Sequence, residues 1–353
     1  MIHECKQQHD IMSKSKLTYS PDDFTRFDES NDFTFYSQDR FVNHLDSLAL
    51  SSVRSLIGEL VIEDNPVILD LMAGWDSHIP ESIRSKKVVG LGLNRNELDN
   101  NPALNQVVIH DINADPILPF PDDTFDVVVN TLSIAYIKRP FEVFSEVGRI
   151  LRQGGLFLVI FSNRMFLKKA VKIWREADDD ERIILVEDFF NTTGKFEKPT
   201  LFISRGKPRP ESDKYFHLGI PSDPVYALYA DKKSTFTRRN PRPNITSAYG
   251  KPLDNRELRA REKSVGKTLC CPHCGERLSK WAVPDNPFCQ TWDNEYMFIC
   301  FNDHCPYYVR GWELMYRQTN KTMSYRFMYN PDKDCTMPIP VPSAKALKDG
   351  IIL

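Results

Sequence analysis

The sequence predicts an α/β fold, a doubly wound parallel sheet with helices on both faces, followed by a small β-rich domain. Three observations support this prediction. Five short runs rich in Val, Ile and Leu recur through the first half of the 353-residue chain. Each run is apolar throughout rather than alternating, as in strands that are buried on both faces. Polar or helical stretches separate the runs, and the resulting alternation of strand and helix is typical of a parallel sheet.

The predicted strands and helices follow one another in a regular order. A helix is expected over 41–60, where apolar residues have helical spacing. Another is expected over Arg139–Arg152, because Pro140 suits a first helical turn and Gly154-Gly155 suits its end. The five strand-like runs are Pro66–Met72, Lys87–Leu93, Gln106–His110, Phe125–Thr131 and Gly155–Phe161.

The rest of the chain divides by composition. Residues 163–194 have a helical pattern, and Thr200–Ser204 and Val225–Ala230 are expected to be the last two strands. Residues 231–268 contain eleven Lys and Arg but four Asp and Glu, a local charge of +7. We therefore expect five segments: a lead-in or lid (1–35), the α/β domain (36–231), a basic linker (232–268), a cysteine-rich ribbon (269–330) and a tail (331–353).

Composition excludes several classes of protein. The hydrophobic share of 41% and charged share of 27% are those of a soluble globular protein, and the net charge of −2 argues against binding polyanions through bulk charge. The first residues are polar and contain no signal peptide. No apolar run approaches the roughly 20 residues that span a bilayer, so no membrane association is expected. We expect a cytoplasmic protein.

A ligand of a doubly wound sheet binds at the carboxyl ends of the strands. Three segments around these ends, Asp70–Gly74, 110–130 and 146–164, resemble class I S-adenosylmethionine-dependent methyltransferases of the type 11 group, over roughly residues 36–232. The chain also resembles a little-characterised subgroup of plants and photosynthetic bacteria, whose pattern Asp-Leu-x-x-x-Trp-x-Ser-His-x-Pro is matched from Asp70 to Pro80. The resemblance implies a Rossmann-like methyltransferase sheet and S-adenosylmethionine as cofactor.

The resemblance also implies a set of cofactor-binding positions, with departures. The family has three glycines after the first strand, but Met72, Gly74 and Asp76 stand there, and its acidic ribose-binding residue is replaced by Gly92. Asn94 or Glu97 is a candidate to reach the ribose instead. A pocket that has lost its cofactor remains the alternative. The implied cofactor-binding residues are Tyr36, Asp70, Leu71, Met72, Ala73, Gly74, Leu93, Asn94, Asp111, Ile112, Asn130 and Thr131.

Methyl transfer asks little catalysis of the protein, because the methyl group of a sulfonium is already activated and needs mainly to be positioned. No catalytic triad is visible. The candidates for an acid–base or substrate-facing role are His44, His78 and Tyr136. A histidine near its ordinary pKa can accept a proton at neutral pH. For each of the three, packing or capping is the alternative role.

Seven of the eight cysteines lie between Cys270 and Cys335. Two pairs, Cys271 with Cys274 and Cys300 with Cys305, each lie on a short turn, which is the arrangement of a four-sulfur zinc site. The second pair, with Asn302 inside it, resembles the ogr/Delta-like zinc fingers. His304 in place of Cys305 is the main alternative ligand. We expect one zinc ion in a ribbon that stabilises the domain or recruits substrate.

The sequence therefore predicts an S-adenosylmethionine-dependent methyltransferase that acts on an unidentified acceptor. The alternative is a non-catalytic, ligand-sensing relative that binds nucleic acid or a protein through the ribbon. The basic linker favours nucleic acid as a partner. A nucleic-acid methyltransferase is a third hypothesis, although the Asn/Asp-Pro-Pro-Tyr/Phe motif is replaced at Asn130 by Asn-Thr-Leu-Ser.

Overall fold

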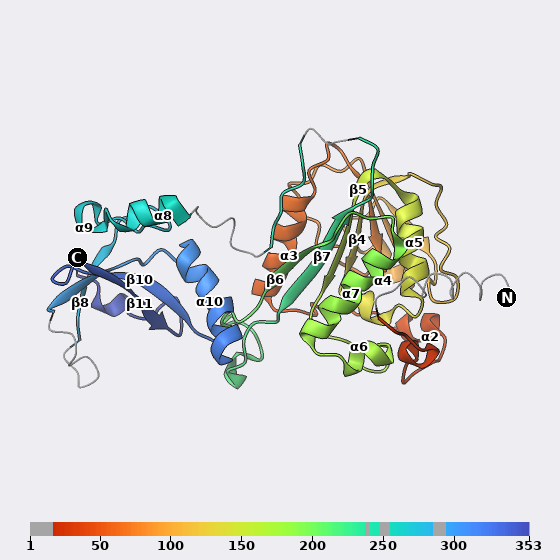
Figure 1. The fold of residues 1–353 in the computed structure, drawn as a ribbon. Helices are drawn as coiled ribbons and strands as arrows, with labels where there is room; N and C mark the ends of the chain where they lie inside the picture. Colours follow the sequence, from red (N-terminus) through yellow and green to blue (C-terminus); the bar gives the residue numbers. More distant parts are fainter. Residues whose placement is uncertain (1–16, 237–239, 247–254, 285–293, 353) are drawn as a thin grey trace. The chain divides into compact units, whose positions relative to one another are not determined.

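The computed structural model describes residues 17–236, 240–246, 255–284 and 294–352 (Figure 1). The chain forms two compact units. The first comprises Met1–Ile203 and Asp223–Thr246, and the second comprises Ser204–Ser222 and Ser247–Leu353. The chain therefore leaves the first unit after Ile203 and returns to it at Asp223. Cys5 and Cys289 lie outside the described residues.

The first unit contains a seven-stranded sheet in the order β3-β2-β1-β4-β5-β7-β6. The strands from β1 to β5 are parallel, and β7 runs antiparallel to β5. This arrangement confirms the predicted α/β fold with a parallel sheet. The strands are β1 (Val67–Leu71), β2 (Lys87–Gly92), β3 (Gln106–Ile109), β4 (Phe125–Thr131), β5 (Leu151–Phe161), β6 (Thr200–Ser204) and β7 (Val225–Asp231).

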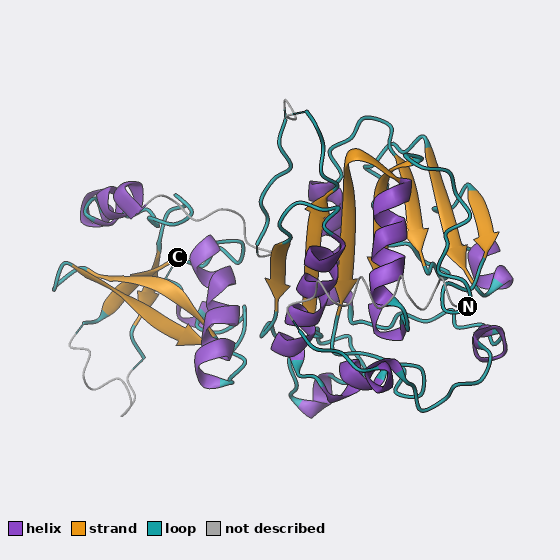
Figure 2. Ribbon diagram, turned by 45° about the vertical axis from the view of Figure 1, so that its right-hand side comes forward, coloured by secondary structure: helices purple, strands orange, loops and turns teal. Residues whose placement is uncertain are grey.

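Helices cover both faces of this sheet (Figure 2). Alternate residues of each central strand enter two separate apolar cores. On one face Ile68 and Val127 pack with α3, and on the other Leu69 and Val128 pack with α5 and α7. Burial on both faces explains why the strands are apolar throughout. The helices are α2 (Asp32–Tyr36), α3 (Ser47–Leu60), α4 (Arg95–Asp99), α5 (Pro140–Ile150), α6 (Lys172–Glu176) and α7 (Asp179–Thr193), with short 3₁₀ turns at Pro21–Phe24 and Ile134–Tyr136.

The helix predicted over 41–60 begins only at Ser47. The Asp46 carboxylate accepts hydrogen bonds from the backbone N–H groups of Leu48 and Ala49, so it caps the helix at that point. The pattern over 163–194 likewise resolves into α6 and α7, with Asp178 capping the second of them.

The second unit contains a four-stranded antiparallel sheet in the order β11-β10-β9-β8. Helix α10 packs on the sheet through Tyr308 and Trp312, in a core that also contains three of the cysteines. The strands are β8 (Ser279–Ala282), β9 (Tyr296–Ile299), β10 (Ser324–Asn330) and β11 (Cys335–Val341); the helices are α8 (Asn255–Glu262), α9 (Val265–Thr268) and α10 (Pro306–Thr319), with 3₁₀ turns at Phe216–Leu218 and Lys348–Gly350.

Two segment boundaries differ from those expected. The predicted tail contains β11, which pairs with β10 over seven positions. Ile339 and Val341 point into the core, while Pro338 and Pro340 alternate with them on an edge strand that can tolerate missing N–H groups. The predicted basic linker contains α8 and α9, and Val265 of α9 is fully buried in the core of the second unit. No described helix is long and apolar enough to cross a membrane.

Candidate functional site

The turn after β1 keeps the path of a glycine-rich loop although side chains occupy two of its glycine positions. Met72 has φ of 63°, in the left-handed region that favours glycine, and holding a larger residue there costs about 1–2 kcal/mol. The backbone N–H of Ala73 then donates to the carbonyl of Leu91 at 2.8 Å, which holds the turn over β2. The Met72 side chain is half-buried against the apolar core.

The Asp76 side chain is held on the side of helix α3. Its carboxylate pairs with Arg54 of α3 at 2.9 Å and with Nδ1 of His78 at 3.0 Å. Burial acts to raise the pKa of Asp76, but the hydrogen bond with His78 and the charge of Arg54 together outweigh it and keep the pKa well below its usual range. The side chains of Met72 and Asp76, which replace family glycines in this turn, thus both contact other parts of the protein.

Asp70 braces this turn from beneath. Its carboxyl group is 4% exposed and accepts a hydrogen bond from Ser77. Ser77 in turn accepts from Asn101 at 2.9 Å, and the same Asn101 amide donates to the carbonyl of Gly74 at 2.8 Å. Burial raises the pKa of Asp70 to about 7, against the smaller opposing effect of Ser77. Asp70 is therefore partly protonated at neutral pH.

The end of β2 explains why the family's acidic residue is missing. A Cβ atom on Gly92 would lie 2.4 Å from the backbone oxygen of Ala73, so no side chain fits there. Glu97 brings a carboxylate to the same region, because a Cβ on Gly74 would lie 3.4 Å from its Oε2 atom. The other oxygen, Oε1, accepts from the backbone N–H of Arg40 at 2.7 Å. Burial raises the pKa of Glu97.

Of the two residues considered for the ribose, Asn94 is already engaged. Its Oδ1 caps helix α4 by accepting from the N–H of Glu97 at 3.1 Å, and its Nδ2 donates to Asp39 at 2.9 Å. The neighbouring Leu93 is half-buried. Glu97 is consequently the acidic side chain that lies against the turn.

The ends of β3 and β4 carry the next predicted positions. Asp111 accepts from the N–H groups of Asn113 at 2.9 Å and Ala114 at 3.3 Å through the same oxygen, and Ile112 is buried. At the end of β4, the side-chain amide of Asn130 donates to the carbonyl of Leu71 at 2.9 Å. This bond ties the end of β4 to the end of β1.

A buried ionic cluster, which the sequence analysis did not identify, fixes the segment before the sheet. Asp32 is 3% exposed and pairs with Arg26 at 2.8 Å and with Lys169, which is fully buried, at 3.1 Å. Asn113 also donates to Asp32 at 3.0 Å and to the carbonyl of Tyr136 at 3.0 Å. The described part of the predicted lead-in is therefore anchored to the end of β3 and to the segment after β5.

Three buried polar atoms of the predicted cofactor residues have no hydrogen-bond partner within the described chain. They are the hydroxyl of Tyr36, Oδ1 of Asn130 and Oγ1 of Thr131. Tyr36 ends the helix that the ionic cluster anchors, and burial raises the pKa of its phenol. Buried polar groups in folded proteins are almost always paired, and a bound polar ligand is one kind of partner that would pair these three atoms.

The three catalytic candidates have different surroundings. The hydroxyl of Tyr136 accepts from the backbone N–H of Phe166 at 2.9 Å, and the two rings stack at 5.9 Å. Burial raises the pKa of Tyr136 to about 12, so it keeps its proton. His78 is paired with Asp76. His44 packs edge-on against Phe166, with ring centroids 5.4 Å apart. Although the residue as a whole is exposed, desolvation of its imidazole, followed by the charge of Arg40, lowers its pKa. His44 is therefore neutral at physiological pH.

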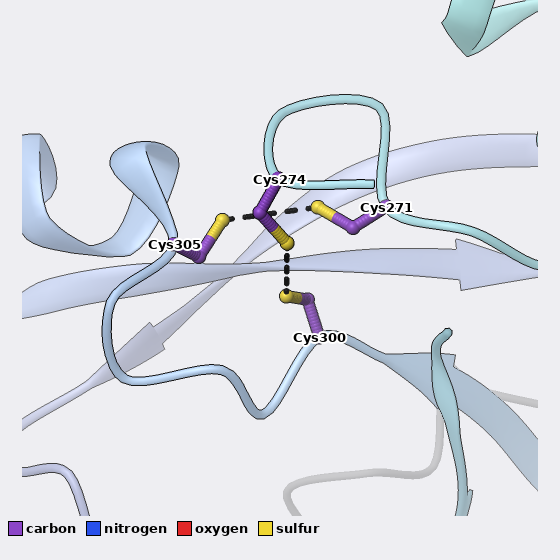
Figure 3. A group of neighbouring side chains, drawn as sticks. All are labelled: Cys271, Cys274, Cys300 and Cys305. Carbon is purple, nitrogen blue, oxygen red and sulfur yellow. Dashed lines mark hydrogen bonds between the residues drawn. The ribbon is translucent and has the colours of Figure 1, made fainter. Parts of the chain in front are cut away.

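The four predicted cysteine ligands meet in the second unit (Figure 3). The Sγ atoms of Cys271 and Cys305 are 3.8 Å apart, those of Cys274 and Cys300 are 3.6 Å apart, and all four lie within 4.8 Å of one another. A tetrahedral zinc ion with bonds of ~2.3 Å requires sulfur separations of about 3.8 Å. The cluster therefore has the donor set of a zinc site, and its two shortest sulfur separations match this spacing.

Local sequence positions both pairs. Gly275 has φ of 78° and closes the first turn by donating to the carbonyl of Cys271 at 2.8 Å. In the second turn, Asn302 accepts from the N–H of His304 at 2.8 Å, and Cys305 precedes the first residue of α10. His304 is exposed and is not part of the cluster among the described residues, so the alternative ligand is not supported.

Arg326 holds the second turn from the core, another role that the sequence did not indicate. This fully buried side chain donates to the carbonyl of Cys300 at 3.2 Å, to Asp303 at 2.5 Å and to the carbonyl of Ala344 at 3.0 Å. Lys348 pairs with the other oxygen of Asp303 at 2.7 Å. The C-terminal segment is thereby tied to the cysteine turn.

Comparison with known proteins identifies the first unit. Residues 74–159, from the glycine turn to β5, match the family described as "Methyltransferase domain". This part of the chain is similar to that family, and the match spans 86 of the 353 residues. The match and the strand order agree with the predicted class I S-adenosylmethionine-dependent type. No curated protein matches the chain.

Solved structures resemble about half of this chain at low identity. An S-adenosylmethionine-dependent methyltransferase from Archaeoglobus fulgidus is 13% identical, covering 57% of this chain and 100% of its own, with a TM-score of 0.39. A possible histamine N-methyltransferase from Thermotoga maritima is 16% identical, covering 54% and 91%, with a TM-score of 0.38. A Haloferax volcanii complex of a methyltransferase with the activator Trm112 contains a chain that is 14% identical, covering 53% and 91%, with a TM-score of 0.38.

Proposed function

We propose that the first unit transfers a methyl group from S-adenosylmethionine and that the second unit is a zinc-stabilised module. The observation that carries the first part is the set of buried, unpartnered polar atoms on Tyr36, Asn130 and Thr131. They belong to the strand end and the anchored helix where the cofactor is expected, and a polar ligand would satisfy them.

The residues present fit a nucleoside ligand, provided that Glu97 takes over the ribose-binding role. The turn Asp70–Gly74 holds the methionine end, and Asp111 with Ile112 takes the adenine edge and face. Glu97 takes the role of the acidic residue that is missing from β2. Its carboxylate lies next to Gly74 in the turn, whereas Gly92 has no room for a side chain. Its raised pKa reflects a half-buried carboxylate, which gains from hydrogen bonds donated by two ribose hydroxyls.

The bound cofactor supplies an activated methyl group, and the chain supplies position and exclusion of water. The neutral imidazole of His44 is the side chain suited to accept a proton from the attacking atom of the acceptor. Tyr136 retains its proton and instead holds Phe166, on which His44 packs. The acceptor is not specified by these residues.

Titration calorimetry with S-adenosylhomocysteine tests cofactor binding. We expect micromolar binding by the full chain and about tenfold weaker binding by Glu97→Gln, since a hydrogen bond to a charged group contributes roughly 1.5–3 kcal/mol. Asp99→Asn is the matched control, because Asp99 lies on the same helix and its exposed carboxylate pairs with the exposed Arg95. Absence of heat and of any thermal shift at millimolar ligand would refute the enzyme hypothesis.

The second candidate, a non-catalytic ligand sensor, is favoured by Met72 and Gly92, which depart from the family pattern. It predicts cofactor binding without turnover. Methyl transfer from radiolabelled S-adenosylmethionine to any component of a small-molecule and nucleic-acid panel, abolished by His44→Gln but not by Lys86→Gln, would exclude it.

A further inference from the structure

A row of three aromatic rings lies beside the cysteine cluster in the second unit. His273, from the first cysteine turn, stacks on Tyr307 of α10 with ring centroids 4.3 Å apart and an angle of 24°. Tyr307 packs against Tyr325 of β10 at 4.6 Å. All three residues are half-buried, so part of each ring is accessible to solvent. Three separate segments of the chain thus contribute to one continuous aromatic surface.

Basic side chains flank this row. Arg310 lies one helical turn after Tyr307 and interacts electrostatically with both His273 and Tyr325. Val265, three residues after the end of α8, lies in the apolar cluster against which Tyr307 packs, and Glu262 at the end of α8 interacts electrostatically with Tyr307. Exposed basic residues of α8 and the following turns are Arg256, Arg259, Lys263 and Lys267.

Helix α8 contributes no buried residue to the core of the second unit. None of its residues is buried, whereas α9 immediately after it anchors the segment through the fully buried Val265. Between Asn255 and Thr268 there are five Lys and Arg and two Asp and Glu. A positively charged helix that is held beside an aromatic surface offers charge complementarity to phosphates and stacking surfaces to bases.

We propose that this aromatic row and the basic residues of α8 together bind single-stranded nucleic acid. Unpaired bases stack on the accessible parts of the rings, and Arg259, Lys263 and Arg310 neutralise the phosphates. A duplex is a poorer ligand because its base faces are already stacked within the helix. The surface gives the second unit a recognition role beyond the proposed stabilisation by zinc.

Fluorescence anisotropy of the full chain with labelled 20-nucleotide RNA, DNA single strands and a DNA duplex tests this proposal. The assay needs no methyl donor, so its result is independent of the proposed enzyme activity. We expect binding of a single strand, tighter than that of the duplex, with affinity falling steeply as salt is raised. Comparing the RNA and DNA single strands shows which of the two nucleic acids the surface prefers.

Two pairs of variants separate charge from stacking. Arg259→Glu with Lys263→Glu should weaken binding and lower the slope of log affinity against log salt by about 1.4, since two phosphate contacts are lost. Its control is Arg84→Glu with Lys86→Glu, an equal charge change at exposed positions of the first unit. Tyr325→Ser should weaken binding about tenfold with the slope unchanged, while Tyr325→Phe should bind normally.

Several outcomes would overturn the proposal. They are no single-strand binding at 50 mM salt, equal loss in both charge-reversal variants, or a duplex preferred over single strands. Equal zinc content and melting temperature in all variants would establish that each change acts on the surface rather than on folding. A protein partner that binds this surface while nucleic acid does not would also refute the proposal.

Discussion

Replacing Asp70 by Asn should stabilise the first unit at alkaline pH while it weakens the candidate cofactor site. Burial raises the pKa of this carboxyl from 3.8 to about 7. A carboxyl whose pKa is raised on folding favours the folded state at low pH, and this contribution is lost as pH rises from about 4 to 7. At pH 8 the buried charge of Asp70 therefore costs about 4 kcal/mol relative to a neutral side chain. At pH 5 the cost is about 2 kcal/mol.

The Asn side chain has the same shape and still accepts the hydrogen bond from Ser77, so Asp70→Asn removes mainly the cost of the charge. Urea unfolding at pH 5 and pH 8, read by hydrogen exchange of the β1 amides, reports the first unit alone. We expect the advantage of the variant over the natural chain to grow by about 2 kcal/mol between the two pH values. The other titrating groups cancel in this difference.

Asp76→Asn is the matched control from the same turn. Contacts with His78 and Arg54 lower the pKa of Asp76 despite its burial. The charged form of Asp76 therefore stabilises the folded state at every pH above the ordinary pKa of a carboxyl group. Asp76→Asn should accordingly lose stability at pH 8. If the difference in unfolding free energy between Asp70→Asn and the natural chain did not change with pH, the reasoning would be refuted. A loss of stability in Asp70→Asn at pH 8 would also refute the view that the charge of the buried Asp70 destabilises the fold.

Three further predictions concern the cofactor pocket and the cysteine cluster. Cys305→Ser should reduce zinc from one ion per chain to a small fraction and unfold the second unit, as measured by metal analysis and circular dichroism, whereas Cys335→Ser should keep the metal. Tyr36→Phe should leave the melting temperature of the unliganded chain unchanged or higher, because the hydroxyl has no hydrogen-bond partner among the described residues. It should nevertheless reduce the thermal shift given by S-adenosylhomocysteine, and an equal ligand shift would contradict the assigned site. Arg326→Met should speed zinc transfer to a chromogenic chelator at least severalfold, because the turn around Cys300 loses its brace, and unchanged release would show that the brace is unimportant.

Local patterns account for what the sequence could predict. The five apolar runs become strands of the sheet because residues such as Ile68 and Leu69 are buried on opposite faces, and that leaves a continuous apolar signature. The cysteine pairs were equally predictable, since each turn is built from neighbouring residues. In both cases the residues that determine the structure are separated by only a few positions along the chain.

Contacts between distant segments account for what the sequence could not predict. The exclusion of a side chain at Gly92 depends on the backbone of Ala73, and the burial of Lys169 depends on Asp32, 137 positions earlier. Strand β11 was predicted as a tail because its alternating prolines suppress the usual strand signature. Only the pairing with β10 shows that these prolines occupy an edge.

The excursion from Ser204 to Ser222 has a consequence for any attempt to isolate either unit. Its Gly206 lies so close to α10 that a Cβ would meet the carbonyl of Trp312 at 2.7 Å, so this loop is built into the second unit although it connects β6 to β7. A chain ended at residue 246 would retain the loop without its packing partners, and a chain begun at 247 would lack the loop that packs on α10. A single protease cleavage at one connection would give two fragments that stay associated without a covalent bond, because at least one unit would be packed from parts of both. A nicked protein should therefore migrate as one species until it is denatured.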